Sequence, residues 1–419
     1  MPDHDLAPGK VDRCQITGSQ NLFEAADLGH QPPCDALLTR EMLDKPEKSY
    51  PLRLMICPES GSAQLDYVVD GSEIYYPDYP YRSGISKPLE EYQRAFADDI
   101  VRRFELRPNA LCVDVGSNDG TLLTGFARNG MRPLGVEPTN IARIARSENK
   151  IETIQSFFTA ALAKDIVRDY GRAKIVTMTN VFAHMATLGE VMRGLSELLD
   201  ADGVFITESQ YLLDVLESNQ FEGIYHEHVR TYSLRALVKL MPYYGLEVFD
   251  VQRAERYGGN IRAYVARNGV QQVDFRVARL LAEEEEKGLF NPDTWALWRR
   301  RVDTNRVRFM ELAYEAKRKG WRFVGNSCPG RGAVLVNYYG LDKSLMPYVA
   351  ELPNGLKVGR YLPGKHIPVV SNEILFEEQP EYAVLLAWHY SDYMVKDLRS
   401  RGLKSKFVIP LPEFRIVGA

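Results

Sequence analysis

Four consecutive residues, Tyr225-His226-Glu227-His228, place a phenol, two imidazoles and a carboxylate in one short segment. An imidazole with a pKa near ~6.5 can accept a proton at neutral pH, and a neighbouring carboxylate can orient it. In an extended chain His226 and His228 would share one face, whereas a turn would remove this relation. The alternatives are a metal site or a surface loop, but the His-Glu-x-x-His pattern is absent. The segment therefore favours general acid–base catalysis.

A glycine-rich turn follows the apolar run at residues 111–115 and is the second chemical signal. Glycines at a strand-to-helix turn let a cofactor approach the backbone, and here they are Gly116 and Gly120. A dinucleotide fingerprint would need glycine at 118 and 121, where Asn118 and Thr121 stand. Glu137 ends the next strand and can accept hydrogen bonds from ribose hydroxyls. The pattern indicates the first motif of S-adenosylmethionine-dependent methyltransferases rather than a structural turn beside a surface glutamate.

The elements that must position these groups form three compositional regions. Residues 1 to about 85 predict a loop-rich module of small strands. Such a small unit usually needs a disulfide or a structural metal ion to be stable. From about 88 to 265, apolar strands alternate with helical periodicity, which is typical of a doubly wound parallel sheet. Residues 272–319 predict two helices joined near Asn291-Pro292-Asp293, and a second, smaller alternating series follows them.

The predicted elements of the two alternating series are helix 89–106, strand 111–115, a helix ending at 127, strands 133–136 and 175–179, helix 188–199, strand 203–208, strand 322–325, helix 333–341, and strands 347–351, 382–387 and 407–409.

Composition limits the classes of protein to which the chain can belong. It has 419 residues, of which 45% are hydrophobic and 26% charged, and a formal net charge of -4. These values indicate a globular protein with several packed units. They argue against general nucleic-acid or anionic-membrane binding, which depends on summed positive charge. The chain has no long apolar run and no signal peptide, so a cytoplasmic location is expected. A monomer is compatible with the sequence, which does not determine the oligomeric state.

Seven motifs in order make the chain resemble the nucleotide-sugar C-methyltransferases that act on dTDP-4-keto-deoxyhexoses, over roughly residues 12 to 415. The motifs are Leu28-Gly29-His30-Gln31-Pro32-Pro33, Tyr79-Pro80-Tyr81-Arg82-Ser83, Asp114 to Gly120, Asn180 to His184, Tyr225 to His228, Tyr257-Gly258-Gly259-Asn260, and Gly359-Arg360-Tyr361-Leu362-Pro363-Gly364.

The resemblance implies an α/β chain with a central doubly wound, Rossmann-like methyltransferase domain at 88–265. It also implies a small zinc-type N-terminal module at 1–87, and a helical connector with a smaller C-terminal α/β domain that binds the nucleotide sugar at 266–419. The implied catalytic residues are His228, Glu227, Tyr79, His184 and Tyr225. The expected cofactor-binding residues are Gly116, Asn118, Gly120, Glu137, Pro138 and Asn180. The expected substrate-binding residues are Tyr81, Arg256, Tyr257, Asn260, Arg331, Lys357 and Arg360.

The zinc site that the resemblance implies is where the sequence departs from the family pattern of two Cys-x-x-Cys pairs. Cys14 is followed at +3 by Thr17, and Cys57 at +3 by Ser60. Neutral hydroxyls are poor zinc ligands in closed structural sites. His30 and Cys34 could complete a set with Cys14 and Cys57, although no spacing argument requires it. Structural zinc and a metal-free module therefore both stay open.

The expected reaction transfers a methyl group from S-adenosylmethionine to a carbon next to the ketone of a dTDP-linked ketosugar, most simply C-3. Such a carbon reacts as an enolate, so a base, an enolate stabiliser and a dry pocket are required. We expect His228, oriented by Glu227, to be the base, and Tyr79 or His184 to act on the enolate. The alternatives are methylation at C-5 or of another nucleotide sugar, and a non-catalytic partner-binding protein.

Overall fold

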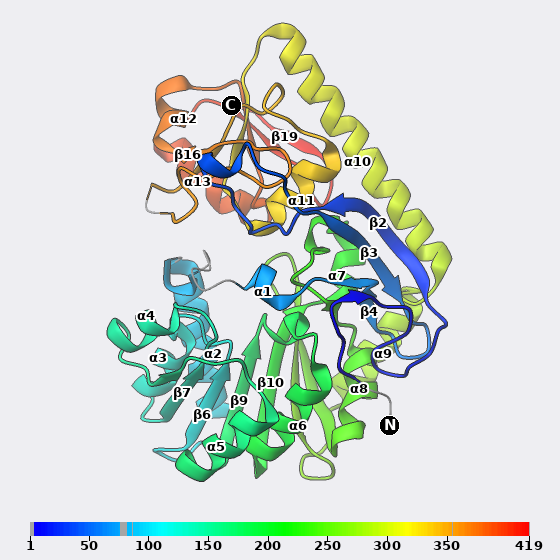
Figure 1. The fold of residues 1–419 in the computed structure, drawn as a ribbon, viewed down its shortest axis with the longest axis vertical. Helices are drawn as coiled ribbons and strands as arrows, with labels where there is room; N and C mark the ends of the chain where they lie inside the picture. Colours follow the sequence, from blue (N-terminus) through cyan, green and yellow to red (C-terminus); the bar gives the residue numbers. More distant parts are fainter. Residues whose placement is uncertain (1–3, 76–81, 86, 354, 419) are drawn as a thin grey trace.

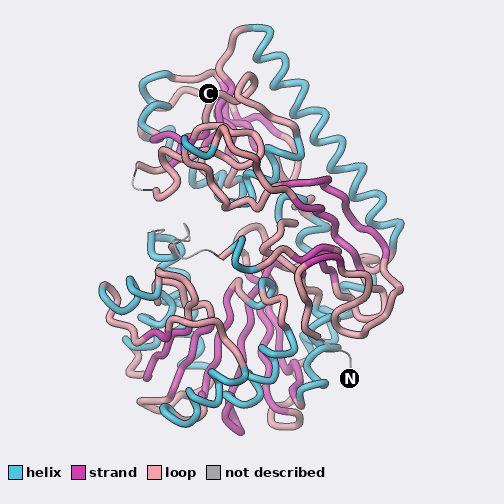
Figure 2. The backbone as a smooth tube through the Cα atoms, viewed as in Figure 1, coloured by secondary structure: helices cyan, strands magenta, loops and turns pink. Residues whose placement is uncertain are grey.

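The computed structural model describes residues 4–75, 82–85, 87–353 and 355–418, in which two α/β regions flank an N-terminal strand module (Figure 1). Tyr79 and Tyr81 lie outside the described residues. Figure 2 shows the alternation of helices and strands in both regions. Among the described residues, no helix combines the length and apolar character needed to cross a membrane.

Seven strands form the central sheet, in the order β12-β13-β10-β9-β6-β7-β8. Their bounds are β6 (Leu111–Val115), β7 (Arg132–Val136), β8 (Thr153–Ile154), β9 (Ala173–Thr179), β10 (Leu199–Gln210), β12 (Leu246–Ala254) and β13 (Asn260–Arg267). The strands from β10 to β8 run parallel, whereas β13 is antiparallel to both of its neighbours. All five residues of β6 are buried, as expected for a parallel strand covered on both faces.

Helices cover both faces of this sheet, which confirms the doubly wound α/β fold. They are α2 (Lys87–Arg103), α3 (Thr121–Arg128), α4 (Ala142–Ser147), α5 (Ala160–Tyr170), α6 (Leu188–Leu198), α7 (Leu212–Glu217) and α8 (Leu234–Leu240). The antiparallel pair β12–β13 was not predicted, because its strands lack the intervening helix by which the others were identified.

The N-terminal module forms a four-stranded sheet in the order β11-β4-β3-β2, with a two-stranded pair β1–β5 beside it. Its elements are β1 (Gly9–Lys10), β2 (Phe23–Gln31), β3 (Tyr50–Ile56), β4 (Ala63–Leu65), β5 (Tyr67–Val68) and α1 (Gly71–Ile74). The edge strand β11 (Arg230–Thr231) comes from the central region and pairs with β4. The N-terminal sheet is therefore completed by a segment far along the chain.

The C-terminal region contains a six-stranded sheet in the order β16-β15-β14-β17-β18-β19. Its elements are β14 (Phe323–Asn326), α11 (Gly330–Tyr339), β15 (Val349–Glu351), β16 (Val369–Ser371), α12 (Glu373–Glu378), β17 (Tyr382–Leu385), α13 (Ser391–Ser400), β18 (Lys406–Ile409) and β19 (Arg415–Val417). Only β19 is antiparallel to its neighbour. The second α/β series is thus observed as predicted.

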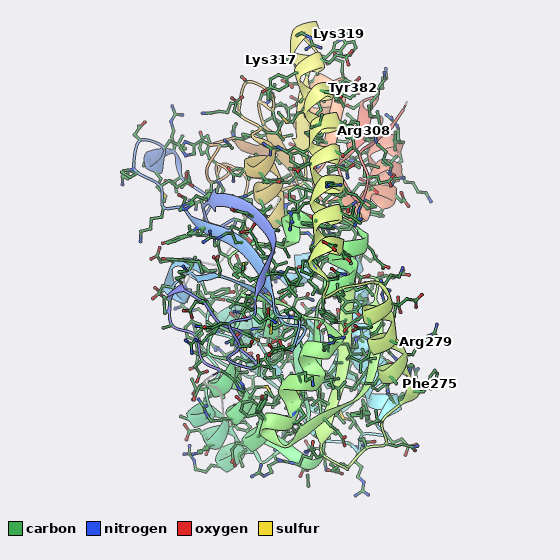
Figure 3. All side chains as sticks on the ribbon, turned by 90° about the vertical axis from the view of Figure 1, so that its right-hand side faces the viewer. Phe275, Arg279, Arg308, Lys317, Lys319 and Tyr382 are labelled. Atoms are coloured by element: carbon green, nitrogen blue, oxygen red, sulfur yellow. The ribbon has the colours of Figure 1, made fainter. Side chains whose placement is uncertain are left out.

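Two helices, α9 (Phe275–Glu286) and α10 (Pro292–Lys319), connect the two α/β regions. The side chain of Asn291 caps α10, and Pro292 occupies its first turn, as the sequence predicts. Figure 3 shows α10 along one side of the molecule, with Lys317 and Lys319 at the far end from α9. Trp298 donates to the Val215 carbonyl and Arg299 donates to the Ala25 carbonyl, so α10 fixes the central and N-terminal regions together.

Candidate active site

A cavity of about 740 Å³ opens beyond the carboxyl ends of the parallel strands β6, β7 and β9. This is where ligands bind in doubly wound sheets. Residues of the N-terminal module, the central sheet and the C-terminal region all contribute to its wall. The volume is within the range of small-molecule and cofactor sites. One cavity therefore receives groups from the whole chain.

The glycine turn after β6 forms the first wall of the cavity. Gly116 has φ 72°, and a Cβ atom there would lie 2.5 Å from Cγ2 of Val181. Gly120, with φ 77°, precedes the first residue of α3. Both positions need glycine, because positive φ is strained for other residues and Gly116 has no room for a side chain. The turn therefore leaves its backbone open to a ligand, as the sequence predicts for a cofactor site.

Glu137 follows β7, is only 5% exposed and lines the same cavity as Asn118 and Pro138. One carboxylate oxygen accepts a hydrogen bond from the Asn118 backbone N–H at 3.0 Å. The other accepts from the backbone N–H and hydroxyl of Thr139, at 2.9 and 2.7 Å. A carboxylate has about four lone-pair positions, so it can also accept from ribose hydroxyls. The turn and Glu137 together fit the adenosyl group of S-adenosylmethionine.

Asn180 lies between two parts of the cavity. One is the cofactor wall, lined by the glycine turn and Glu137, and the other is lined by the expected substrate-binding residues. Its backbone N–H donates to the Glu208 carbonyl at 2.6 Å, and its side-chain oxygen accepts from Asn260 at 3.2 Å. The Glu208 carboxylate is fully buried and accepts from Asn260, Arg256 and Arg262. Burial opposes ionisation of Glu208, but the two arginines lower its pKa below the usual value. The charged carboxylate thus fixes Asn260, which in turn holds the side chain of Asn180.

This role of Glu208 was not predicted from the sequence. Its position at the carboxyl end of β10, beside the ends of β9 and β6, was the signal that could have identified it.

Tyr225 and His228 meet across a turn, so the relation expected for an extended segment does not apply. The His228 N–H donates to the Tyr225 carbonyl at 2.9 Å, and the Tyr225 hydroxyl lies 2.8 Å from Nε2 of His228. Nδ1 of His228 lies 3.0 Å from the Gly223 carbonyl and 3.1 Å from Oε1 of Gln210. His226 turns away, with its Nε2 3.2 Å from the Pro51 carbonyl in the N-terminal module. The two histidines therefore do not act as a pair.

His184 and Glu227 lie beside this pair. The His184 and His228 ring centroids are 4.9 Å apart, and the Tyr75 hydroxyl is 2.8 Å from Nδ1 of His184. Glu227, which was expected to orient His228, approaches the same Nδ1 of His184 at 4.0 Å. Burial and the charge of Arg230 lower the pKa of His184 to about 4. Burial, followed by the neighbouring His184, lowers the pKa of His228. Both rings are neutral at pH 7.

Tyr75 was not predicted as a site residue, because nothing distinguishes it from the other tyrosines of the segment 75–81. Burial, followed by the charge of Glu227, raises its pKa, so its hydroxyl stays protonated.

Three of the predicted substrate-binding cations line the cavity, and each already faces a carboxylate. Arg256 faces Glu208 at 3.5 Å, and Tyr257 beside it also lines the cavity. Arg331 lies 3.5 Å from Glu222, and Lys357 lies 2.7 Å from Asp35. The last two pairs join the C-terminal region to the central region and to the N-terminal module, respectively.

Arg360 departs from the prediction: it is exposed and is not among the residues lining the cavity. It follows a turn in which its own N–H donates to the Lys357 carbonyl, so only Lys357 of this pair reaches the cavity.

The expected zinc position contains two facing turns of the N-terminal module. Sγ of Cys14 lies 3.1 Å from the Ser60 hydroxyl, and the Thr17 hydroxyl lies 3.9 Å from Sγ of Cys57. Cys14 and Cys57 are buried, and the hydrogen bond that the Cys14 thiol donates to Cys57, together with burial, raises the pKa of Cys14. Two thiols and two neutral hydroxyls do not fit the donor set of a structural zinc ion. The chemistry of the cavity is therefore derived without a metal ion at these residues.

Neither His30 nor Cys34 completes this set. His30 is exposed on β2, whereas Cys34 has its thiol near the carboxylates of Asp35 and Glu227, within 4.8 Å. No other group of three such donors occurs in the part of the chain that the structure describes. Lys357 already supplies a positive charge to Asp35, so a bound cation is not required there.

Comparison with known proteins gives three consecutive family matches. The "Putative zinc binding domain" matches residues 14–75, the "Methyltransferase domain" residues 89–251, and the "C-methyltransferase C-terminal domain" residues 255–412. The C-methyltransferase NovU of Streptomyces niveus is 31% identical over 414 residues, which is 98% of this chain and 97% of that protein.

Solved structures resemble part of the chain. An S-adenosylmethionine-dependent methyltransferase from Anabaena variabilis has a TM-score of 0.33 and 16% identity, covering 42% of this chain and 85% of its own. Magnesium protoporphyrin IX methyltransferase from Synechocystis, with bound S-adenosylmethionine, has a TM-score of 0.33 and 13% identity, covering 43% and 79%. At these values neither structure bears on the chemistry of this chain.

The relative from Streptomyces niveus matches almost from end to end, and the three family matches follow one another in the order that the sequence motifs indicated. The chain is thus an enzyme, and the non-catalytic alternative is set aside. These findings show that the chain belongs to the C-methyltransferase family and uses S-adenosylmethionine as its methyl donor.

Proposed function

We propose that the enzyme methylates C-3 of a dTDP-4-keto-deoxyhexose in deoxysugar biosynthesis. The observation that carries this proposal is the Tyr225–His228 pair, which lines the same cavity as the glycine turn and Glu137. A proton acceptor beside a methyl-donor site suits methylation of carbon. The sugar and the carbon position come from the motif resemblance, and the proposed division of labour follows segments 1–87, 88–265 and 266–419.

A base is needed because the carbon next to a ketone becomes a nucleophile only after it has lost a proton. Bound S-adenosylmethionine supplies a methyl group attached to a positively charged sulfur. The chain must therefore remove one proton from the sugar and stabilise the negative charge on the keto oxygen. It must also hold the sugar carbon towards the cofactor wall formed by Gly116 and Glu137.

The hydrogen bonds of His228 define how the proton moves. Nδ1 faces the Gly223 carbonyl, which can only accept, so Nδ1 carries the ring proton. Nε2 then has the free lone pair and accepts from the Tyr225 hydroxyl. In the proposed step the Tyr225 oxygen takes the proton from the sugar carbon while its own proton passes to Nε2. His228 thus acts as the base through Tyr225.

The negative charge that develops on the keto oxygen needs a hydrogen-bond donor. His184 is the described residue best placed for this role, because it lines the cavity and its ring lies 4.9 Å from the ring of His228. Tyr79, the other candidate, lies outside the described residues. The low pKa of His184 keeps the ring neutral. The N–H of a neutral imidazole can donate a hydrogen bond to the keto oxygen while keeping its proton.

The nucleotide diphosphate is assigned to Arg331 and Lys357. Both are on the C-terminal side of the cavity, and both are held by carboxylates of other regions. A diphosphate can replace Glu222 or Asp35 as the partner of these cations, because charge-assisted hydrogen bonds to phosphate are strong. Substrate binding would then replace contacts between regions by contacts of the same cations with the diphosphate.

A mass-spectrometric screen of dTDP-4-ketohexoses tests the proposal. Incubation with S-adenosylmethionine should add one methylene to the accepted sugar, and the His228→Asn enzyme serves as the negative control. Carbon NMR of the product then locates the new methyl group. A product methylated at C-5 would contradict the assigned position, and the absence of any methylated ketosugar across the screen would contradict the substrate class.

A further inference from the structure

Tyr75 is a half-buried neighbour of the reacting centre to which no step has been assigned. It follows helix α1 of the N-terminal module, lines the cavity, and its hydroxyl lies 2.8 Å from Nδ1 of His184. The two rings are stacked, with centroids 6.1 Å apart and an interplanar angle of 26°. The hydroxyl and the ring stacking together fix the plane of the imidazole.

The backbone of His184 is fixed independently of its ring. Arg230 is 1% exposed and donates to the Phe182 carbonyl at 3.1 Å and to the Met185 carbonyl at 2.6 Å. These carbonyls flank the short helical turn that ends at His184. Because the main chain cannot shift freely, the remaining freedom of His184 is the rotation of its ring and the choice of tautomer.

Only one nitrogen of His184 is left for a substrate. Nδ1 faces Tyr75, whereas Nε2 has no hydrogen-bond partner among the residues that the structure describes. The side chain is 17% exposed, and the residue lines the cavity. The carboxylate of Glu227 approaches Nδ1 only to 4.0 Å, which is beyond hydrogen-bond distance. Tyr75 is therefore the group that determines the state of Nδ1.

We infer that Tyr75 is a positioning residue: its hydroxyl donates to Nδ1 and holds His184 as the tautomer whose Nε2–H points into the cavity. The inference rests on the proposed function, in which His184 donates to the keto oxygen. With the opposite tautomer, Nε2 would present a lone pair to the developing negative charge and would repel it. A neutral ring has one proton, so the partner of one nitrogen decides the role of the other.

The tautomer can be measured without any substrate. Long-range ¹⁵N–¹H correlation spectra of the full-length protein with ¹⁵N-labelled histidine should show His184 protonated at Nε2 at pH 7, with the signal assigned by its loss in His184→Asn. Tyr75→Phe should give a mixture of tautomers or the Nδ1–H form. A parent enzyme with Nδ1–H, or a Tyr75→Phe enzyme with unchanged Nε2–H, would overturn the inference, whatever sugar the enzyme accepts.

Turnover supplies the second readout. Loss of one oriented hydrogen bond in Tyr75→Phe should lower kcat about 3- to 10-fold while KM changes little. His184→Asn should lose more, and Tyr75→Phe in that background should cost nothing further, since the phenol acts through the imidazole. Independent, multiplying effects would overturn the inference. Tyr348→Phe, which removes a buried hydroxyl bound to Glu378 outside the cavity, is the matched control and should keep the parent kcat.

Discussion

The cavity and the N-terminal turns both contain a cluster of buried polar side chains, but the clusters differ in what they leave free. In the cavity, Tyr75–His184 and Tyr225–His228 form two phenol–imidazole pairs, and one imidazole nitrogen still faces open space. In the N-terminal module, each thiol is matched by a hydroxyl of the facing turn. The first arrangement can act on a ligand, whereas the second can only hold two turns together.

Burial therefore does not by itself distinguish a catalytic cluster from a structural one. What distinguishes them is whether one polar atom remains directed towards a cavity after its neighbours have been satisfied. Four experiments test this difference.

The largest effect should come from converting the closed cluster, which consists of Cys14, Thr17, Cys57 and Ser60, into a metal site. Thr17→Cys combined with Ser60→Cys supplies four thiols at the spacing of a structural zinc site. The variant should bind about one zinc per chain with an apparent affinity of ~10 kcal/mol or more, while the parent should bind close to none. Elemental analysis of protein prepared without chelators measures both. Thr17→Ala with Ser60→Ala is the control, and stoichiometric zinc in the parent would contradict the closed-cluster interpretation.

Removing the base in the cavity should have the next largest effect. His228→Asn should lower turnover ~100- to 10,000-fold, because the proton of Tyr225 then has no acceptor. Affinity for S-adenosylmethionine should be retained. Exchange of the alpha proton with deuterated solvent, measured without the methyl donor, isolates this step. His366→Asn, an imidazole held by Glu47 on the surface, is the control, and parent-rate exchange in His228→Asn would place the base elsewhere.

A substitution in the cofactor wall should have a more moderate effect on binding. Glu137→Ala removes a carboxylate assigned to the ribose hydroxyls and should weaken S-adenosylmethionine binding by about 1.5 to 3 kcal/mol, the range for charged hydrogen bonds. Calorimetric titration of the folded variant measures the loss. Glu152→Ala, which removes an exposed carboxylate bound to Tyr170, should bind as the parent does. An unchanged dissociation constant for Glu137→Ala would remove this residue from the site.

The smallest effect should appear as a pH dependence of stability. Burial lowers the pKa of His184 and of His226 to about 4, so between about pH 4 and 6.5 the unfolded chain binds more protons. Stability should therefore fall by roughly 1 to 2 kcal/mol per histidine as the pH is lowered from 7 to 5. Urea unfolding at the two pH values, compared between the parent and His226→Asn, checks this: the variant should lose less.

Asp114 acts in the opposite direction and provides a check on the sign. Burial raises its pKa to about 7, so its contribution is present at low pH and is lost as the pH rises through 7. Asp114→Asn should therefore steepen the fall in stability on acidification. A shallower fall in this variant would contradict the raised pKa of Asp114.

The fold could be predicted largely from periodicity, because buried parallel strands and amphipathic helices leave strong patterns. The strand–helix series on both sides of α10 was predicted, as was the start of α10 at Asn291 and Pro292. The pair β12–β13 was not, because no helix separates its strands, and the pairing of β11 with β4 was not, because partners distant in sequence leave no local signal. In the site, residue types identified Glu137 and Tyr225 to His228, but not their partners.

Those partners depend on tertiary contacts that no spacing encodes. Tyr75 meets His184 across 109 residues, and Asp35 meets Lys357 across 322. Arg360, expected among the substrate-binding residues, is exposed outside the cavity lining, because a turn after Lys357 directs the chain outward.

The pairing of β11 with β4 constrains how the enzyme is made. During synthesis the N-terminal module emerges first, but its edge strand Arg230–Thr231 follows Ala63–Leu65 only after about 165 further residues, or roughly 8 to 33 s of translation. Until then β4 presents an unpaired edge, and Gln15 lacks the buried arginine that donates to it. The N-terminal sheet and the main chain beside His184 therefore both depend on Arg230, a residue made long after the module itself.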